Sequence, residues 1–407
     1  MSKSYYSLGL MSGTSMDGVD ASIIQSDGEK KYKVILDKYF EYPTSIYKKL
    51  TILRDKIKSS KDLKKFSKEV KNVEKEITLF HSDMVNQILK KTKVNVDLIG
   101  FHGQTIYHNA EEKISRQLGD GNLLSKITKK TVVYNFRKND IEHGGQGAPL
   151  TPIFHNLLAA QIQKKRKDLR GIYNIVNIGG ITNLTSTEPR DTDHLHAYDI
   201  GPGNCLIDQW IRKKTGKRFD KDGLIARSGK PNKLIIKYVI KKFVDDEFQK
   251  YLKEETYPNK HKLISKRTFD TNDFDIIEFK NLSLKDGAAS LTDFTAALIL
   301  FGLHKITMGH PTFSTWIVCG GGRKNKYLLE SITKKASNYL KEVSIFTEES
   351  WEKVSFEPID KYGINGDFVE SQAFAYLAIR SYLKLPITFP CTTGVKNPST
   401  GGTIVKY

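Results

Sequence analysis

A short pattern recurs four times along this chain: an apolar, strand-like run, a turn rich in glycine, and then a second strand or a helix. It occurs at residues 8–24, 172–185, 197–210 and 316–330. Strands that alternate with helices favour α/β layers. A glycine turn at the end of a strand places backbone N–H groups where a phosphate can bind. The pattern therefore predicts an α/β protein with several candidate phosphate-binding turns.

The glycine turns exclude the two commonest nucleotide-binding motifs. None reads GxxxxGK[ST], and none reads GxGxxG after a strand in a βαβ unit. One glycine turn taken alone is weak evidence, because such turns are common in hairpins. Two glycine hairpins, one in each lobe of a two-lobed protein, could bind a polyphosphate between them.

Length and composition set the broad class. The 407 residues are too many for one small core and indicate two domains, and 39% hydrophobic with 27% charged residues is enough to fold. The net charge of +19 is spread over many lysine-bearing helical stretches. A solvated surface explains this charge better than a specific nucleic-acid site, which would need a compact basic block with interleaved aromatic residues.

The compartment follows from what the sequence lacks. No apolar run approaches the roughly 20 residues that span a bilayer, and the first residues do not resemble a signal peptide. The three cysteines, Cys205, Cys319 and Cys391, are far apart and suggest no disulfide or metal framework. We expect a reduced, cytoplasmic protein without a membrane partner.

Periodicity predicts the main elements before the first long turn region. We expect three strands, a helical region, a buried strand leading into a polar loop, a further strand and a helix, at 5–11, 19–24, 32–40, 45–92, 96–101, 131–136 and from about 153. Later helices are expected at 232–252, 283–306 (with Ser283 and Asp286 as a capping box) and 366–383, and an irregular tail at 386–407.

The first glycine turn carries hydroxyls and carboxylates. Gly13, Thr14, Ser15 and Gly18 supply N–H and O–H donors without bulk. Asp17 and Asp20 would repel phosphate, unless Mg²⁺ joins carboxylates and phosphate oxygens. Asp-Gly is also a favoured hairpin turn pair, and the turn can be structural and still bind Mg²⁺.

Asp199 is a candidate general base. It follows an apolar strand and precedes a Gly-Pro-Gly turn. The alternative is a helix cap, but Asn204 and Cys205 lie nearer the start of the next helix.

Polar residues also gather in FHGQTIYH and NFRKND. His102, Gln104 and Thr105 suit the hydroxyls of a sugar ring, and Arg137 suits a carboxylate. A metal site at His102 and His108 lacks a third ligand, and His108 is better explained as a structural loop residue.

Taken together, these residues resemble one family. LMSGTSMDGVD, FHGQTIYH, QLGD, NFRKNDIEHGGQGAPL, NIGGITN, YDIGPGN, LTDFTA and CGGGRKN occur in the order found in anhydro-N-acetylmuramic acid kinases and cover most of residues 8–330. The chain departs from the family pattern within 257–270 and at Ser371 and Gln372, but it keeps Glu370.

The resemblance implies the two-lobed α/β fold of the actin, Hsp70 and hexokinase group, with a nucleotide cleft between the lobes. The first lobe would be 1–140 plus about 385–407, and the second 141–384. The implied site has a catalytic base at Asp199, sugar contacts at His102, Gln104, Thr105, Arg137 and Glu370, and Mg²⁺ at Asp17 or Asp20. ATP would contact Gly13, Thr14, Ser15, Met16, Asp17, Gly18, Val19, Asp20, Gly179, Gly180, Gly320, Gly321 and Gly322.

The resemblance also implies the reaction and its partners. Asp199 would deprotonate a water that opens 1,6-anhydro-N-acetylmuramic acid, and O6 would take the γ-phosphoryl group of ATP, giving N-acetylmuramic acid 6-phosphate and ADP in cell-wall recycling. From its chemistry, Arg137 would bind the lactyl carboxylate. The family suggests a homodimer. Three alternatives remain open: a kinase of the same fold for another amino sugar, an ATP-dependent interaction protein, and a nucleic-acid-binding module.

Overall fold

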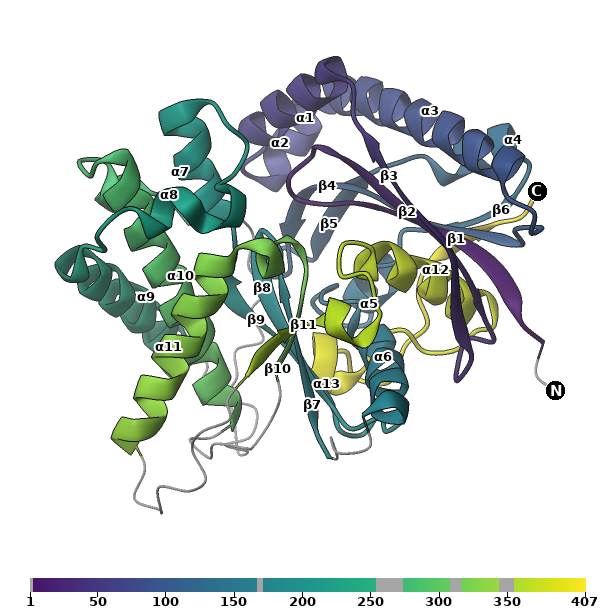
Figure 1. The fold of residues 1–407 in the computed structure, drawn as a ribbon. Coiled ribbons are helices and arrows are strands. Elements are labelled where there is room, and N and C mark those ends of the chain that lie inside the picture. The colour runs from purple at the N-terminus through teal and green to yellow at the C-terminus, as the bar shows by residue number, and fades with distance from the viewer. Residues whose placement is uncertain (1–2, 167–170, 254–273, 308–315, 344–354) are drawn as a thin grey trace. The chain divides into compact units, whose positions relative to one another are not determined.

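The computed structural model describes residues 3–166, 171–253, 274–307, 316–343 and 355–407. The chain divides into two compact units. Unit 1 comprises Met1–Lys167, Thr187–Ala197 and Asp367–Tyr407, and unit 2 comprises Asp168–Ser186 and Tyr198–Gly366. Each contains a β-sheet with helices (Figure 1). The expected α/β class with two sheets is confirmed.

Among its described residues, unit 1 has a seven-stranded sheet in the order β12-β6-β4-β1-β2-β3, with β5 paired to β4. Its strands are β1 (Tyr5–Ser12), β2 (Gly18–Ser26), β3 (Tyr32–Glu41), β4 (Leu98–Asn109), β5 (Ile114–Leu118), β6 (Thr131–Tyr134) and β12 (Thr403–Val405). β1 and β2 form an antiparallel hairpin, as expected, while β4 runs parallel to β1 and β6. The first glycine turn is the β1–β2 connection.

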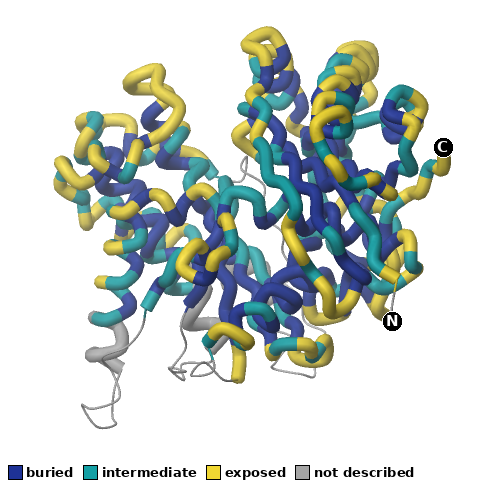
Figure 2. The backbone as a smooth tube through the Cα atoms, turned by 45° about the vertical axis from the view of Figure 1, so that its right-hand side comes forward, coloured by how far each residue is buried: buried dark blue, intermediate teal, exposed yellow. Residues whose placement is uncertain are grey.

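Alternate residues of this sheet face two different sets of helices. Leu8, Leu10 and Phe101 belong to one core with helices α1 (Thr44–Lys56), α3 (Ser67–Lys91) and α4 (Gly121–Thr128). The opposite face receives α12 (Val369–Tyr382), which packs on β1, β2 and β4 (Figure 1). Buried backbone follows the strands, whereas the outer helices alternate between buried and exposed positions (Figure 2).

Two glycines in neighbouring strands let α12 lie close to the sheet. Gly9 and Gly100 are partners in the β1–β4 register. A Cβ on Gly9 would lie 1.9 Å from Ser371 O, and one on Gly100 would lie 2.2 Å from Phe374 O. Only glycine fits at these two positions, which brings the first turn of α12, with Glu370, onto the sheet.

The expected polar loop after residue 101 is wrong, because β4 continues through HGQTIYHN to Asn109. Its pairing with β1 shifts by one residue, since Leu10 pairs with Phe101 but Ser12 pairs with Gln104. Gly103 lies in the shifted segment with a φ of +75°. A glycine in this conformation is typical of a β-bulge, so the polar residues lie on a bulged strand.

The tail is more ordered than predicted. Residues 403–405 form β12, which pairs antiparallel with β6, and α13 (Pro390–Thr393) precedes it. Thr393 Oγ1 donates to Asp140 Oδ1 over 2.6 Å, and Gly147 N donates to Asp140 Oδ2 over 2.7 Å. The tail therefore takes its structure from contacts with residues more than two hundred positions earlier, which local periodicity does not reveal.

The lobe boundaries expected from the sequence differ from those of the units. Of the expected second lobe, residues 141–166, 187–197 and 367–384 belong to unit 1. The reason is packing: α6 (Pro152–Lys165) places Phe154 against Tyr32 of β3 and Tyr376 of α12, with ring centroids 5.3 and 5.6 Å apart.

The helical region at 45–92 is divided into three helices. α1 ends at Lys56, a short α2 (Ser60–Lys65) follows, and α3 then runs for 25 residues. Ser59 begins α2, and the Asp62 side chain accepts from its backbone N–H over 2.9 Å, as a capping box requires.

Unit 2 contains most of the five-stranded sheet, in the order β11-β10-β7-β8-β9. The strands are β7 (Tyr173–Ile178), β8 (Ile181–Thr187), β9 (Leu195–Pro202), β10 (Trp316–Cys319) and β11 (Phe356–Pro358). β10 is parallel to both β7 and β11. The carboxyl ends of β7 and β10 therefore lie at the same edge, and each leads directly into a glycine turn.

Helices complete unit 2 around two buried clusters, one built on β7 and β10 and the other around Trp210. They are α7 (Cys205–Thr215), α8 (Leu224–Arg227), α9 (Lys233–Lys253), α10 (Leu284–Thr307) and α11 (Lys326–Val343), with short 3₁₀ turns η1 (Lys221–Gly223), η4 (Ile277–Phe279), η5 (Gly321–Lys324) and η7 (Ile359–Tyr362). Unit 1 also has the short α5 (Lys138–Glu142). Ser283 and Asp286 form the predicted cap of α10. Residues 257–270 lie outside the described residues.

Within the described ranges, no helix combines the length and the apolar character that crossing a membrane requires.

Candidate active site

The β1–β2 turn exposes small polar residues at its tip. Thr14 and Ser15 are exposed, Gly13 and Asp17 are half-buried, and Met16 N donates to Gly13 O over 3.2 Å. Ser15 Oγ donates to Asp17 Oδ1, so a hydroxyl and a carboxylate are already paired at the tip. A side chain on Gly13 would meet no atom closer than 3.9 Å, which leaves room beside its backbone.

Three other residues of the predicted ATP turn, Met16, Gly18 and Val19, are required by packing. Met16, with a φ of +57°, is 2% exposed, and Val19 is fully buried in the unit 1 core. A Cβ on Gly18 would lie 2.4 Å from Phe40 O. Met16 and Val19 can thus offer a ligand only backbone atoms, and Gly18 is required by packing.

The two predicted magnesium ligands occupy different parts of the hairpin. Asp17 lies in the turn, while Asp20 lies within β2 and pairs with Met11 and Tyr39. Val19 and Ala21 face the core beside α3, and Ser22 contacts Ser371 of α12 over 2.7 Å. By strand alternation, Asp20 lies on the same face as Ser22, which is the face that carries α12.

Gln104 is fully buried, and both ends of its amide bind the start of the same turn. Ser12 Oγ donates to Gln104 Oε1 over 2.6 Å, and Gln104 Nε2 donates to Gly13 O over 3.0 Å. Tyr42 OH donates to Ser12 Oγ over 3.1 Å. Ser12 and Tyr42 are partners that sequence reasoning missed, because they come from β1 and from the residue after β3.

Buried His102 and half-buried Arg137 form a pair on the other side of β4. Arg137 Nη2 donates to His102 Nε2 over 3.0 Å, and Arg137 Nη1 donates to Gly147 O over 2.8 Å. Because a guanidinium only donates, Nε2 must accept, and Nδ1 carries the proton that it donates to Gly103 O over 2.8 Å. Burial and the Arg137 charge lower the pKa of His102 to about 3, so the ring stays neutral.

Thr105 belongs to a chain of polar contacts between β4 and β5. Gln117 Nε2 donates to Thr105 Oγ1 over 3.3 Å and to Ser115 Oγ over 2.8 Å, and His108 Nδ1 lies 2.9 Å from Ser115 Oγ. His108 therefore has a structural partner on β5, in agreement with the structural explanation preferred for it. Gln117 belongs to the QLGD motif, but the sequence did not show that it would bind Thr105.

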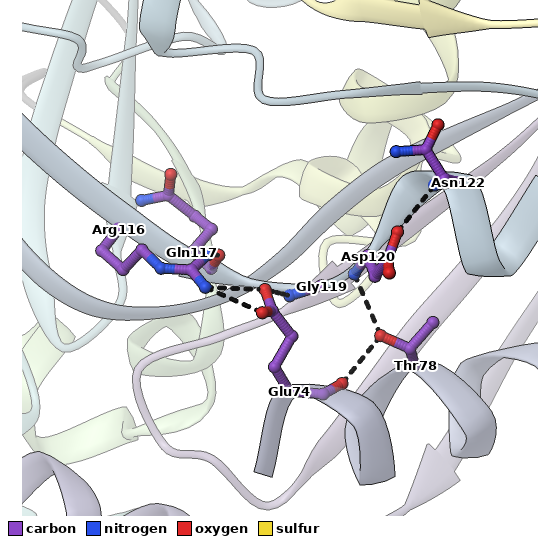
Figure 3. Close-up of polar contacts among 7 residues, drawn as sticks. All are labelled: Glu74, Thr78, Arg116, Gln117, Gly119, Asp120 and Asn122. Atoms are coloured by element: carbon purple, nitrogen blue, oxygen red, sulfur yellow. Dashed lines mark hydrogen bonds and ion pairs between the residues drawn. The ribbon is translucent and has the colours of Figure 1, made fainter. Parts of the chain in front are cut away.

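The QLGD segment, at the end of β5, is fixed by α3 (Figure 3). Arg116 Nη2 donates to both carboxylate oxygens of Glu74 over 2.8 and 2.9 Å, and Gly119 N donates to Glu74 Oε1 over 3.0 Å. Asp120 N donates to Thr78 Oγ1, while its carboxylate caps α4 by accepting from Asn122 N over 2.9 Å. Asp120 is thus a helix cap.

In unit 2, the first glycine turn binds the start of α7. The carbonyls of Gly179 and Gly180 accept from Asn204 N and Gly203 N, each over 2.8 Å. A Cβ on Gly203 would lie 2.3 Å from Gly179 O. Because C=O and N–H of one peptide point in opposite directions, the N–H of Gly180 points away from Asn204.

The second glycine turn of unit 2 lies against the end of β7. Gly320 has a φ of +77°, and a Cβ there would lie 2.4 Å from Asn177 Oδ1; one on Gly322 would lie 2.2 Å from Ile178 Cγ2. Gly321 differs, because its nearest atom would be Asn204 Nδ2 at 3.8 Å. The structure thus brings Gly179, Gly180 and the 320–322 turn together around Asn204.

Arg323 anchors this turn. Its Nε and Nη2 donate to the two carboxylate oxygens of Asp360 over 2.6 and 3.1 Å, and Nη1 donates to Gly320 O over 3.0 Å. Burial would raise the pKa of Asp360, but the hydrogen bonds and charge of Arg323 together with backbone hydrogen bonds outweigh it and keep that pKa below its ordinary value. The sequence gave no sign of Asp360.

Asp199 is half-buried within β9, three residues before the strand ends at Pro202. α7 begins after Asn204, so Asp199 is not its cap. Glu370 is half-buried in the first turn of α12 in unit 1.

One cluster that sequence reasoning missed lies between β8 and β9. Ligand atoms of Glu188, Asp191 and His194 lie within 4.8 Å of one another, and the Asn156 amide donates to the carbonyls of Glu188 and Asp191 over 2.8 and 2.9 Å. The hydrogen bond and charge of Asp191 raise the pKa of His194. Exposed acidic groups commonly occur without a metal, so we assign no site here.

Comparison with known proteins identifies the family. The family model described as anhydro-N-acetylmuramic acid kinase matches residues 5–407. The relative of that name from Pelagibacter ubique (strain HTCC1062) is 49% identical over 407 residues, covering 100% of each chain. Those from Agrobacterium fabrum and Rhodospirillum rubrum are 36% and 34% identical, cover 98% of this chain, and are themselves covered over 98% and 93% of their lengths.

A solved ROK family glucokinase from Streptomyces griseus covers 92% of this chain and 99% of its own at 11% identity, with a TM-score of 0.37, which is too low to carry an argument. The family model and the full-length relatives are decisive: this chain belongs to the anhydro-N-acetylmuramic acid kinase family.

Proposed function

We propose that this protein uses ATP to open 1,6-anhydro-N-acetylmuramic acid and to phosphorylate O6, giving N-acetylmuramic acid 6-phosphate and ADP in cell-wall recycling. One observation carries the proposal: relatives named for this activity match the chain from end to end, at up to 49% identity. The described residues are compatible with the activity, because glycine turns follow β1, β7 and β10, and Asp199 is a half-buried carboxylate of β9.

The phosphates of ATP are assigned to glycine turns of both units. In unit 1, Gly13 O accepts from Gln104, so the N–H of Thr14, in the same peptide, points away from Gln104 toward the exposed tip. In unit 2, the N–H of Gly180 and the open position at Gly321 offer similar access. Preorganised backbone donors of this kind stabilise phosphoryl transfer by positioning and charge.

A carboxylate of the β1–β2 hairpin is the proposed magnesium ligand. Mg²⁺ needs one or two carboxylates besides phosphate oxygens and water. Asp17 offers a carboxylate in the turn, and Asp20 offers the alternative within β2. The ion, when bound, would neutralise charge on the transferred phosphoryl group. The carboxylate of Asp17 accepts a hydrogen bond from the Ser15 hydroxyl, and this bond orients the carboxylate at the tip.

Asp199 is assigned as the general base. It would take a proton from water as the water oxygen bonds to the anomeric carbon. The bond from that carbon to O6 breaks, and the electron pair left on O6 attacks the γ-phosphorus, with ADP as leaving group. The reactants are the anhydro sugar, water and ATP. The products are N-acetylmuramic acid 6-phosphate, ADP and the proton taken by Asp199.

The sugar is assigned to the polar residues of unit 1. Arg137 is the proposed partner of the lactyl carboxylate, and Thr105 and Glu370 are proposed to bind hydroxyls or the acetamido group. The sequence gave His102 and Gln104 the same role. Because these two side chains are at most 4% exposed and are bonded within unit 1, we propose that they act through their neighbours.

Two further assignments come from the family resemblance. We propose that the protein is a homodimer, which light scattering after size exclusion would test, and that it works in the cytoplasm, which cell fractionation would test.

Transfer of phosphate from ATP tests the proposal. The purified protein is assayed with Mg²⁺ and 1,6-anhydro-N-acetylmuramic acid, N-acetylmuramic acid or N-acetylglucosamine. We expect transfer to the anhydro sugar, and a fall in kcat of about 10²- to 10⁴-fold for Asp199→Asn. Asp193→Asn is the matched control, because Asp193 is an exposed carboxylate just before β9.

The other outcomes discriminate among the alternatives. Transfer only to a sugar without the anhydro bridge would indicate another amino-sugar kinase. ATP binding without transfer to any sugar would indicate an interaction protein. Equal activity of Asp199→Asn and Asp193→Asn would remove Asp199 from the reaction.

A further inference from the structure

The bulge in β4 sends two neighbouring polar side chains to opposite faces of the unit 1 sheet. In a regular strand, residues two apart share a face, so His102 and Gln104 would point the same way. Here the register gains one residue between Phe101 and Gln104. The ring of His102 lies 4.5 Å from that of Phe374 on α12, whereas Gln104 binds Ser12, which contacts Tyr42.

Tyr42 identifies the face that Gln104 shares. Its ring lies 5.0 Å from Phe80 and 6.2 Å from His81, both on α3. Gln104 is thus on the α3 face, with the β1–β2 turn, and His102 is on the α12 face, with Arg137. Gly103 makes this possible, because its φ of +75° favours glycine and a Cβ there would lie 2.4 Å from Leu118 O.

Each side chain fixes one proposed ligand-binding group. The Gln104 amide fixes the Gly13 carbonyl, and through the same peptide it fixes the direction of the Thr14 N–H. His102 Nε2 accepts a hydrogen bond from Arg137 Nη2, and the Gly147 carbonyl accepts one from Arg137 Nη1. A neutral ring is needed for this, because a protonated one would have no acceptor for the guanidinium.

We propose that Gln104 is a positioning residue for the nucleotide turn and that His102 is a positioning residue for the sugar's carboxylate-binding arginine. The Gly103 bulge separates the two tasks. This inference rests on the proposed function, because that function assigns ATP to the turn and the lactyl carboxylate to Arg137. It predicts that the two ligands respond separately to substitutions only two residues apart.

The experiment measures two affinities for each variant. Calorimetry gives the Kd of ATP with Mg²⁺, and steady-state kinetics give KM for 1,6-anhydro-N-acetylmuramic acid and for 1,6-anhydro-N-acetylglucosamine, which lacks the lactyl carboxylate. For Gln104→Leu we expect a Kd for ATP weaker by about tenfold and a nearly unchanged KM for either sugar. For His102→Leu we expect the reverse, with KM raised only for the sugar that carries the carboxylate.

Conservative variants separate positioning from damage to the fold. Gln104→Glu keeps an acceptor for Ser12 but loses the donor to Gly13, so it should weaken ATP binding. This variant decides the role of Gln104 if Gln104→Leu folds poorly. His102→Gln keeps an acceptor for Arg137 and should recover much of the sugar KM. Ser12→Ala removes the bond at Gln104 Oε1 and keeps the one to Gly13 O, so its effect on ATP should be smaller and should not add to that of Gln104→Leu.

Several results would overturn the inference. One is an equal rise of both constants in Gln104→Leu and in His102→Leu, and another is wild-type affinity for ATP in Gln104→Glu. If the wild-type protein binds ATP and transfers phosphate to no sugar, the proposed function fails while the ATP measurements still decide the role of Gln104. If the wild-type protein does not bind ATP, both fail.

Discussion

The two units build their parts of the candidate site from different materials. In unit 1, buried side chains orient one another: Gln104 binds Ser12 and Gly13, and His102 binds Arg137. In unit 2, most of these contacts are made by backbone, since the carbonyls of Gly179 and Gly180 bind the start of α7, and Gly320 and Gly322 fit where a Cβ would collide. Arg323 adds a side-chain bond to Gly320 O. Unit 1 should therefore be sensitive to protonation and side-chain removal, and unit 2 to the addition of a single methyl group.

Acidification should give the largest difference between the units. Burial lowers the pKa of His81 to about 4 and that of His102 and His155 to about 3, and all three lie in unit 1. The unfolded chain binds protons below its ordinary pKa of 6.5, while these folded rings remain neutral. Stability is thus complete above pH 6.5 and is lost as the pH falls through the folded pKa values, by roughly 3 kcal/mol for His81 and roughly 5 kcal/mol each for His102 and His155.

Hydrogen exchange and denaturant titrations at neutral and mildly acidic pH would measure this loss. Peptides of α3 in unit 1 should lose protection before those of α10 in unit 2. His81→Leu should flatten the pH dependence, because it removes one buried imidazole. An unchanged slope in this variant, or earlier opening of α10, would contradict the difference between the units.

The second largest effect should be the loss of stability when a methyl group is added to a glycine turn of unit 2. Gly322→Ala places a Cβ 2.2 Å from Ile178 Cγ2 and should cost about 1–3 kcal/mol in unfolding free energy. Gly321→Ala is the matched control, with its nearest atom at 3.8 Å, and should change stability by less than about 0.5 kcal/mol. Thermal melts of both variants measure the effect. If the proposed phosphate contact is right, Gly321→Ala should still weaken ATP binding.

The contacts that tie α12 to the sheet test unit 1 at a smaller scale. Gln372 Nε2 donates to both carboxylate oxygens of Asp37 over 3.0 Å, and Gln372 Oε1 accepts from Tyr32 OH. Gln372→Leu removes the hydrogen-bond partner of these half-buried groups and should cost about 1–2 kcal/mol in a denaturant titration. Ser371→Ala removes a single hydroxyl and should cost less. If Gln372→Leu and Ser371→Ala lower the unfolding free energy equally, the bonds of Gln372 to Asp37 and Tyr32 add no more stability than the single hydroxyl of Ser371.

The smallest effect on stability should come from the exposed tip of the hairpin. Ser15→Ala removes the hydroxyl that donates to Asp17 and should change the unfolding free energy by less than about 0.5 kcal/mol. If Asp17 binds Mg²⁺, the metal dependence of ATP binding should shift, because the carboxylate loses its orientation. Titration of Mg²⁺ against ATP affinity measures this, and a large loss of stability would be the contrary result.

Much of the local structure could be read from the sequence. The β1–β2 hairpin, the strand before each glycine turn, and helices α9 and α12 fall where periodicity placed them. The bulge at Gly103 could not, because a polar run inside a strand looks like a loop when its register partner is unknown. The tail could not either, because β12 exists through its pairing with β6.

The candidate site divides in the same way. The residue types that suit phosphate, sugar and carboxylate were visible, and their order along the chain identified the family. The partners of those residues were not visible. Nothing near Gln104 in the sequence points to Ser12, 92 residues earlier, and nothing near Gln372 points to Asp37, 335 residues away.

The sequence by itself therefore determined the α/β class, the glycine turns, the candidate chemistry and the family, since these depend on residue type and short-range order. The tertiary structure decided which polar side chains can face a ligand and which are buried in support of others. The physical reason is that a buried polar group must find a hydrogen-bond partner, and in this fold the partners of Gln104, His102 and Gln372 come from distant strands and helices.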